Sequence, residues 1–261
     1  MRYADDTLLL ADCEEDLQSL VTTIKEESRK YGLEINRQKT QTMIITKDKE
    51  VPTVKIEIEG KILEQVKQFT YLGQLITEDG RSEAEIKRRI GIAKTIFERM
   101  KKLLTNRKIS YQLKLRMTKC FIWSVLLYAS ETWTLTSTLE KRLEAAEMWI
   151  YRRITRTSWK DKKTNKEVLK QLGLKKPSLI ETIKKRKLSY YGHIRRHDSL
   201  QRKILEGKIE GKRGRGRRRK SWIQNIEETT GLNINRCCEI AKDREKWRSM
   251  TSNLHSEKEP R

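Results

Sequence analysis

The sequence predicts an α+β fold in which short strands come first and helices follow. Before residue 80, short apolar runs alternate with polar residues and are separated by Gly and Asp turns, a pattern typical of strands. After Ser82, apolar residues recur every three or four positions, which is typical of helices. The last third is rich in Lys and Arg. We therefore expect three regions, residues 1–80, 81–160 and 161–261.

The charge of the chain is positive and unevenly distributed. Its 261 residues carry a net charge of +23, and 36 % of them are charged. Residues 1–79 contain 11 Lys and Arg against 16 Asp and Glu, a net of −5, which leaves a net of +28 on the rest. An acidic first segment followed by a basic body suits a metal-binding site beside a track for a polyanion such as nucleic acid.

The cysteines and the hydropathy pattern favour an intracellular protein, nuclear or cytoplasmic. Four cysteines are too few and too irregularly spaced for a disulfide framework, and no secretory signal is visible. The longest apolar run, residues 120–129, is too short to span a bilayer and predicts a buried helix. We expect no membrane partner.

The first eleven residues carry the clearest candidate for chemistry. An aromatic lead-in ends at Tyr3, two adjacent carboxylates follow at Asp5 and Asp6, and residues 8–10 are apolar. This order predicts a tight hairpin with charge at its tip. Adjacent ionised carboxylates repel each other, and a divalent cation is a common means of neutralising them. The alternative is an ordinary turn with solvated acids.

The segment Tyr-Ala-Asp-Asp between apolar strands resembles the catalytic hairpin of reverse transcriptases, and Arg-Tyr-Ala-Asp-Asp-Thr is similar to the version in non-LTR (LINE-type) retrotransposons. The resemblance implies an RNA-directed DNA polymerase, a nucleotidyltransferase that uses Mg²⁺, an RNA template, a DNA primer and deoxynucleotides. It makes Asp5 the catalytic metal ligand and Asp6 its weaker partner. Residues 1–80 would then be the C-terminal part of a polymerase palm.

A helix and a lysine follow the hairpin. We expect the helix to begin near Asp12 with Glu15 and to end at Gly32. Its apolar face would consist of Leu17, Leu20, Val21, Ile24 and Tyr31. An Asn-x-x-Lys39-Thr turn and a short β-type run over 42–45 come next, in the order found in the family. The resemblance makes Lys39 a candidate general acid for the leaving pyrophosphate, with an ordinary surface lysine as the alternative.

Further short strands follow before residue 80. Val54, Ile56 and Ile58 alternate with charged residues and lead into a turn at 59–60. The aromatic run that ends in Tyr71-Leu72-Gly73 is followed by a second apolar run, 74–77. This hairpin resembles the primer grip of the family, so Tyr71, Leu72 and Gly73 are the candidate primer-binding residues. We expect about four short antiparallel strands in all.

Three helices are predicted from Ser82 onward. The first has a capping box of Ser82 with Glu85, the second spans about 109–128, and the third begins at Ser137 with Glu140. Leu113, Met117, Phe121 and Leu127 are expected to face inward on the second helix. Trp123, Trp133, Trp149, Tyr151 and Trp159 are expected in the core rather than as base-stacking groups. Apolar inside and basic outside, this region resembles the family's helical thumb, over residues 81–160.

The most basic part of the chain lies in its last third. Residues 175–220 contain 18 basic and four acidic residues. The densest cluster consists of Lys212, Arg213, Arg215, Arg217, Arg218, Arg219 and Lys220. Interleaved glycines and mutual repulsion predict a partly disordered arm that binds phosphates without sequence preference. A nuclear-localisation signal is compatible with this, and a solvated tail is the alternative.

A short helix with Trp222 and Ile226 is expected after the arm. Related proteins often carry a Cys/His knuckle near this end, and five residues here are potential metal ligands: His193, His197, Cys237, Cys238 and His255. The two histidines have a spacing that suits one helix face, whereas the two cysteines are adjacent rather than two apart. Metal binding by this set stays open.

Several parts of a complete polymerase are missing from the sequence. The third metal-binding aspartate of the family comes from an earlier strand, and that strand, the fingers and the nucleotide-selecting motif are absent. We therefore expect upstream sequence to be missing and this chain alone to be inactive, with Mg²⁺ binding reserved for the intact enzyme. The alternative is a non-enzymatic basic nucleic-acid-binding protein derived from such an element.

Overall fold

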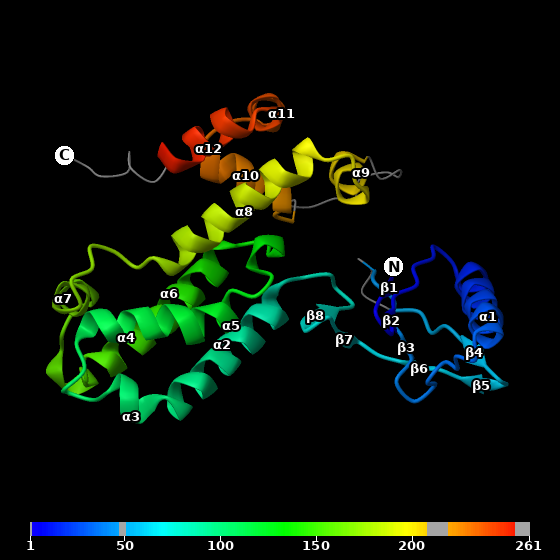
Figure 1. Cartoon of the computed structure of the whole chain (residues 1–261), viewed down its shortest axis with the longest axis horizontal. Helices are drawn as coiled ribbons and strands as arrows, with labels where there is room; N and C mark the ends of the chain where they lie inside the picture. The colour runs from blue at the N-terminus through cyan, green and yellow to red at the C-terminus, as the bar shows by residue number, and fades with distance from the viewer. Residues whose placement is uncertain (1, 47–50, 208–218, 254–261) are drawn as a thin grey trace. The chain divides into compact units, whose positions relative to one another are not determined.

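The computed structural model describes residues 2–46, 51–207 and 219–253. The chain divides into two compact units, Met1–Arg81 and Ser82–Arg261 (Figure 1). The first unit contains all the described strands and one helix, and the second is helical. The mixed α+β character predicted from the sequence is therefore confirmed in outline.

The strands of the first unit form four separate two-stranded pairs. The elements are β1 (Arg2–Tyr3), β2 (Asp6–Thr7), α1 (Glu14–Lys30), β3 (Gln41–Thr42), β4 (Glu57–Ile58), β5 (Lys61–Ile62), β6 (Glu64–Gln65), β7 (Gln68–Tyr71) and β8 (Gln74–Thr77). The pairs β1–β2, β4–β5 and β7–β8 are antiparallel, but β3–β6 is parallel. The expectation of antiparallel strands alone was wrong there, because the long connection over 43–63 provides the crossover that a parallel pair needs.

Helix α1 packs on a small core. Val21, Ile56, Ile58 and Leu63 are its buried members. The Gln18 side chain binds strand β4 in both directions, since its amide donates to the Glu57 carbonyl at 3.0 Å and its oxygen accepts from the Glu57 N–H at 2.7 Å.

Two details of α1 differ from the sequence prediction. The helix is capped by the Cys13 sulfur, which accepts from Asp16 N–H, rather than by Asp12. Leu20 and Tyr31 are exposed although they fall on the predicted apolar face, because the core reaches only the side of the helix that contains Val21.

The second unit is built from helices and short helical turns. They are α2 (Glu83–Arg99), α3 (Lys101–Leu104), α4 (Tyr111–Met117), a π-helical turn (Thr118–Trp123), α5 (Ser124–Leu126), 3₁₀ turns (Ser130–Thr132 and Trp159–Asp161), α6 (Ser137–Ile154), α7 (Asn165–Gln171), α8 (Leu179–Arg196), α9 (Leu200–Glu206), α10 (Trp222–Thr230), α11 (Ile234–Lys242) and α12 (Arg244–Asn253). No helix within the described ranges has the length and apolar character of a membrane span.

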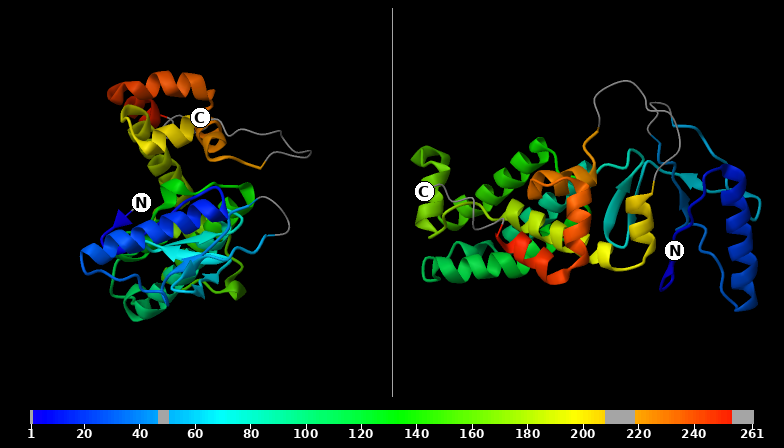
Figure 2. Two further views of the ribbon diagram at one scale, coloured as in Figure 1. Left: turned by 90° about the vertical axis from the view of Figure 1, so that its right-hand side faces the viewer. Right: turned by 90° about the horizontal axis from the view of Figure 1, so that it is seen from above.

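Two cores meet along α8. The larger core lies among α2, α5, α6, α7 and the beginning of α8. The smaller core packs α10, α11 and α12 on the later part of α8, with Leu188, Tyr191 and Trp247 buried in it (Figure 2). Helix α8 therefore belongs to both cores and joins the C-terminal helices to the rest of the unit.

The inward face of the second predicted helix was assigned only partly correctly, with Met117 partly buried against the larger core as expected. Leu113 and Phe121 are exposed, whereas Lys114, Thr118 and Ile122 are buried. Lys114 and Thr118 occupy the buried face of this helix. A search for apolar residues therefore selects positions one residue away from the buried ones. Leu127 is buried as predicted.

The predicted helix caps were also partly wrong. The Ser82 hydroxyl does not cap α2 but accepts from Thr134 N–H at 3.2 Å. Glu85 is 1 % exposed and pairs with the Arg89 guanidinium at 2.6 Å. The cap of α6 is Thr136 rather than Ser137.

The aromatic residues divide between core and surface. Trp123, Trp133 and Tyr151 are buried as predicted, and Trp149 packs partly buried against the larger core. Trp159 is 83 % exposed, so its assignment to the core was wrong. It lies in a short 3₁₀ turn after α6, outside the reach of either core.

A buried carboxylate joins α6 to α8. Glu147 is fully buried on α6 and accepts hydrogen bonds from the backbone N–H groups of Ser178 and Leu179 at 2.9 and 3.0 Å. It also accepts the Tyr151 hydroxyl at 2.7 Å. Because the first N–H groups of a helix have no partner within it, Glu147 supplies the N-terminal cap that α8 lacks from its own Ser178.

We predict that Glu147→Ala lowers the free energy of unfolding by about 3 kcal/mol, because it leaves two backbone donors and a hydroxyl buried without partners. Guanidinium denaturation measures the change. The matched control is Glu144→Ala, at an exposed position of the same helix, with an expected change within about 0.5 kcal/mol. Equal effects of the two variants would contradict the capping role.

Candidate functional site

The first candidate site is the hairpin formed by β1 and β2. Arg2 pairs with Thr7 and Tyr3 with Asp6, so Ala4 and Asp5 form a two-residue turn. Ala4 adopts a positive φ of 51°, and the Arg2 guanidinium donates to its carbonyl at 3.2 Å. The predicted hairpin is therefore present, with Asp5 at its tip and Asp6 on the first strand position after it. Both carboxylates are exposed.

The hairpin does not complete a metal centre by itself. Among the described residues, no group of three or more His, Cys, Asp or Glu side chains is placed to hold a metal ion. Mg²⁺ is usually held by one or two carboxylates together with phosphate oxygens and water. Asp5 and Asp6 have the right donor chemistry, but the described part of the chain adds no third ligand to them, so it does not fit a protein-only Mg²⁺ site.

Lys39 lies in a turn between α1 and β3. Its backbone N–H donates to the Asn36 carbonyl at 3.1 Å, and Asn36 Oδ1 accepts from the same N–H at 3.2 Å. The Lys39 side chain is exposed. The turn therefore presents an accessible lysine. The role of Lys39 as a general acid stays a prediction.

Tyr71, Leu72 and Gly73 lie at the end of the β7–β8 hairpin. Tyr71 pairs with Gln74, and Leu72 and Gly73 form the turn with φ values of 47° and 77°. Two consecutive positive φ values define a type I′ turn, which matches the twist of a hairpin. The predicted hairpin is therefore present, and its primer-binding role stays a prediction.

Most of the predicted basic arm lies outside the described residues. Lys212, Arg213, Arg215, Arg217 and Arg218 are in this undescribed part. Arg219 is described and exposed, and Lys220 forms an ion pair with Glu228 of α10 at 2.6 Å. The end of the basic segment is thus attached to a folded helix.

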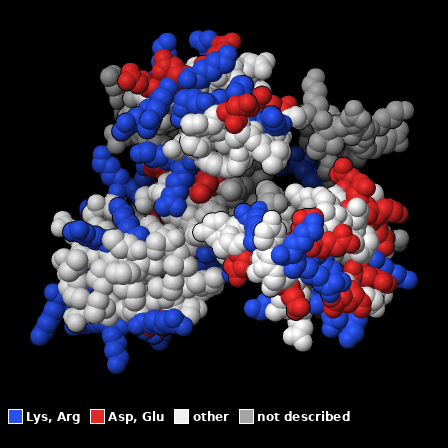
Figure 3. Space-filling view, turned by 45° about the vertical axis from the view of Figure 1, so that its right-hand side comes forward, with Lys and Arg blue, Asp and Glu red and all other residues white. Residues whose placement is uncertain are grey.

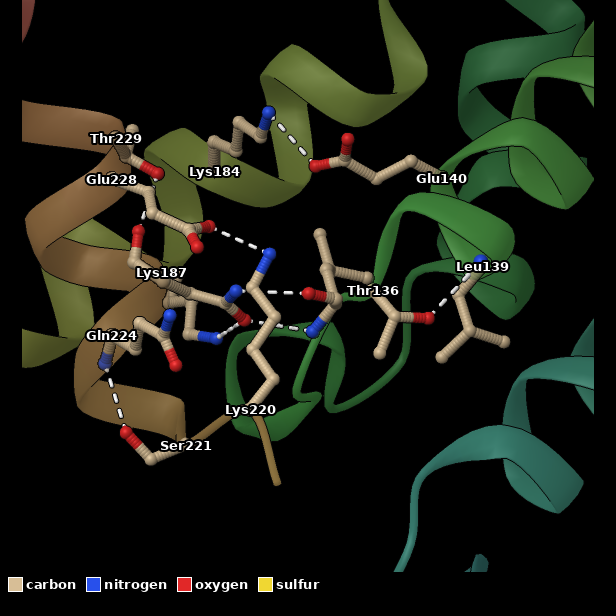
Figure 4. Close-up of polar contacts among 12 residues, drawn as sticks. Thr136, Leu139, Glu140, Lys184, Lys187, Lys220, Ser221, Gln224, Glu228 and Thr229 are labelled. Carbon is tan, nitrogen blue, oxygen red and sulfur yellow. Dashed lines mark hydrogen bonds and ion pairs between the residues drawn. The ribbon is translucent and has the colours of Figure 1, made fainter. Parts of the chain in front are cut away.

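Next to this ion pair lies a buried lysine that the sequence analysis did not identify. Lys187 is 1 % exposed on α8 and lies close to Lys220 and Glu228 (Figure 4). Its ammonium donates to the Trp133 carbonyl at 2.6 Å and to Asn225 Oδ1 at 2.7 Å. It also lies 5.0 Å from the centre of the Trp222 ring. Three segments that are distant in sequence therefore meet at one charge.

Asn225 completes the network from the side of α10. Its side-chain oxygen accepts the Leu135 N–H at 2.7 Å, and its amide nitrogen donates to the Leu135 carbonyl at 2.9 Å. The amide group thus pairs with both backbone groups of Leu135, as a neighbouring strand would. Trp222 adds a further bond, from its indole N–H to the Glu131 carbonyl at 2.8 Å.

The position of Lys187 leaves a weak signal in the sequence. It lies four residues after Ile183 and four before Tyr191, so it falls in the middle of an apolar helix face.

Burial, followed by the nearby Lys220 charge, lowers the pKa of Lys187 to about 7, and Glu228 acts in the opposite direction.

The potential metal ligands do not gather in the described part of the chain. The rings of His193 and His197 lie 4.3 Å apart at the end of α8. Cys237 is buried beside the Thr230 hydroxyl, and the Cys238 sulfur contacts the Tyr191 hydroxyl at 3.2 Å. His255 lies outside the described residues. These contacts place the two cysteines in the smaller core rather than beside the histidines.

The two units differ in surface charge. Asp and Glu side chains stand beside Lys and Arg on the first unit, whereas Lys and Arg predominate on the helical unit (Figure 3). This contrast follows the uneven charge of the sequence. The helical unit therefore presents the stronger attraction for a polyanion.

Comparison with known proteins relates the chain to mobile elements. Residues 1–76 match the family model described as reverse transcriptase (RNA-dependent DNA polymerase). A transposon-derived protein of Caenorhabditis elegans is 27 % identical over 266 residues, which cover 95 % of this chain and 92 % of that protein. No solved structure matches the chain. The resemblance to a retrotransposon reverse transcriptase is supported, and the LINE subtype is compatible with both matches.

The lowered pKa of Lys187 predicts that stability rises with pH above neutrality. An unfolded lysine has a pKa of about 10.4, so between about pH 7 and 10.4 the unfolded chain binds more protons than the folded chain. Stability therefore increases with pH in this window, at most by about 1.4 kcal/mol per pH unit, and is lost as the pH falls toward 7.

Urea denaturation at pH 7, 8 and 9 measures this slope. Lys187→Met should reduce it, while Lys184→Gln, which removes a half-exposed lysine of the same helix, should leave it unchanged. Identical slopes in Lys187→Met and the unaltered chain would contradict the assignment.

Proposed function

We propose that this chain is the C-terminal part of a retrotransposon reverse transcriptase, inactive as a polymerase on its own, which binds nucleic acid through its basic helical unit. The observation that carries the proposal is the match of residues 1–76 to the reverse transcriptases together with the hairpin that presents Asp5 at its tip. The resemblance along 95 % of the chain to a transposon-derived protein supports the same origin for the helical unit.

The roles of the hairpin residues belong to this proposal. In the intact family enzyme, Mg²⁺ supplies charge that stabilises the attacking and leaving oxygens of nucleotide addition. Asp5 and Asp6 would contribute carboxylate oxygens to it, Lys39 a proton, and Tyr71, Leu72 and Gly73 contacts to the primer. The described residues offer no third ligand, and this is the physical reason to expect no primer extension by the isolated chain.

The alternative function, a non-enzymatic nucleic-acid-binding protein derived from such an element, is favoured by the charge distribution. The chain after residue 79 carries a net of +28, and clustered cations bind phosphates with release of counterions. This binding requires neither the hairpin nor Mg²⁺. RNA and DNA are both suitable ligands, because the interaction is with the backbone.

We further propose an intracellular location, nuclear or cytoplasmic. All four cysteines are free thiols, and two of them are exposed, which suits a reducing compartment. The basic segment that ends at Lys220 would support nuclear import.

We predict that the purified chain with Mg²⁺, deoxynucleotides and a DNA-primed RNA template gives no template-dependent extension. A complete reverse transcriptase under the same conditions is the positive control. Any extension that Asp5→Asn abolishes would overturn the proposed inactivity.

We also predict that the chain binds single-stranded RNA with an affinity that falls steeply, on the order of a hundredfold or more, between 50 and 200 mM salt. Fluorescence anisotropy measures this binding. Asp5→Ala should leave the affinity unchanged within about twofold, because binding would depend on the helical unit. Salt-insensitive binding, or binding lost in Asp5→Ala, would contradict this part of the proposal.

A further inference from the structure

A cationic pocket is lined by residues at the end of α3, in the following loop and α4, and at the end of α6. Its volume is about 250 Å³, far more than a single water requires. The lining consists of Thr105, Arg107, Ile109, Ser110, Tyr111, Lys114, Ile154, Thr155 and Arg156. This lining contains three cations, several hydroxyl groups and no carboxylate.

Lys114 has no counter-charge among the residues that the structure describes. Its residue is 3 % exposed, yet no carboxylate of the described chain forms an ion pair with it or with Arg107 and Arg156. The ammonium lies 5.3 Å from the centre of the Tyr111 ring. Burial, followed by the charge of Arg156, lowers the pKa of Lys114. An anion in the pocket would supply the charge that the protein does not.

Arg156 occupies a backbone position that usually belongs to glycine. It follows the C-cap of α6 with a φ of 59°, and the Thr157 N–H closes the turn on the Arg152 carbonyl at 2.8 Å. Its Nε donates to the Thr105 carbonyl at 2.7 Å, which leaves the terminal nitrogens of the guanidinium available at the pocket. A non-glycine residue in this conformation carries backbone strain, which replacement by glycine would relieve.

An exposed aromatic residue follows at a short distance. Trp159 is three residues after Arg156, within about 11 Å along an extended chain, and is 83 % exposed. The surrounding loop contains Lys160, Lys162 and Lys163, and the Lys160 ammonium lies 5.9 Å from the Trp159 ring. A cationic pocket followed three residues later by an exposed indole supplies the two contacts with which proteins hold a single strand, to its backbone phosphates and to the face of a base.

We propose that the pocket of Arg107, Lys114 and Arg156 binds a phosphate group of a single-stranded nucleic acid while Trp159 stacks on a neighbouring base. The guanidinium of Arg156 and the ammonium of Lys114 contact the phosphate oxygens, and hydroxyls such as Ser110 lie beside them. This site is independent of the hairpin at Asp5 and of the basic segment that ends at Lys220. The inference rests on the proposed binding of nucleic acid by the helical unit, and it adds a localised contact to the diffuse charge of that unit.

Anisotropy of a labelled 12-nucleotide single-stranded RNA on the full chain tests the site. Arg156→Gly removes the guanidinium and relieves the positive φ, so it should keep the melting temperature within a few degrees. It should weaken RNA binding on the order of tenfold. Trp159→Ala should weaken RNA binding to a similar extent, because a stacking contact is lost.

The matched control is Lys141→Gln, which removes an exposed positive charge from α6 about 20 Å along the helix from the pocket. It should reduce RNA binding by no more than about twofold. If Arg156→Gly and Trp159→Ala bind RNA as Lys141→Gln does, the site is overturned. That result leaves the proposed binding through the overall charge of the helical unit intact, which salt-insensitive binding or loss of binding in Asp5→Ala would contradict.

Calorimetric titration with inorganic phosphate separates two sources of the same group. We expect inorganic phosphate to compete with RNA for the site, and we expect Arg156→Gly to weaken the binding of both ligands. This result supports a backbone phosphate as the ligand. Phosphate binding that depends on Arg156 without any effect on RNA would overturn the nucleic-acid assignment in favour of a small phosphate compound.

Discussion

The arrangement of the C-terminal half depends on a charge that is removed from water. Lys187 lies inside the helical unit, and such a lysine is tolerated only when polar groups surround its ammonium. The Trp133 carbonyl and the Asn225 side chain provide them, and Asn225 also pairs with the backbone of Leu135. Because these groups come from three separate segments, the hydrogen bonds of this one buried amine hold α8, α10 and residues 133–135 together. Lys220, the last residue of the basic segment, forms an ion pair with Glu228 of α10. The network around Lys187 joins α10 to the unit that is richest in positive charge.

Much of the local structure could be predicted from the sequence, because it depends on local signals. Turn residues located the hairpins at 59–60 and 72–73, and helical spacing located α1, α2 and α6. What could not be predicted depends on contacts between distant segments. The parallel pair β3–β6, the burial of Lys114 on α4, and the cap that Glu147 gives to α8 are of this kind. Helical spacing identifies the buried face of a helix by its apolar residues. It therefore selects the wrong face where a lysine and a threonine are buried, as Lys114 and Thr118 are.

The candidate sites also differ in whether their signal is local in the sequence or depends on contacts between distant segments. The carboxylate hairpin could be found because its signal is contiguous, four residues between two apolar runs. The pocket at Arg107, Lys114 and Arg156 could not, because its cations come from separate elements and each resembles an ordinary surface residue in the sequence. Trp159 was misassigned for a related reason: aromatic residues are buried in most helical units, and only the fold reveals that this one lies beyond both cores.

A double-mutant cycle between Lys187 and Asn225 tests most directly whether this buried network fastens α10 to the helical unit. Lys187→Met, Asn225→Leu and the double variant are compared by their free energies of unfolding in guanidinium. Each single change removes the bond from the Lys187 amine to Asn225 Oδ1 together with that residue's own bonds to Trp133 or Leu135. The double change loses the shared bond only once, so we expect a coupling of about 1–3 kcal/mol. Additivity within about 0.5 kcal/mol would mean that the two side chains act separately, and would contradict the account.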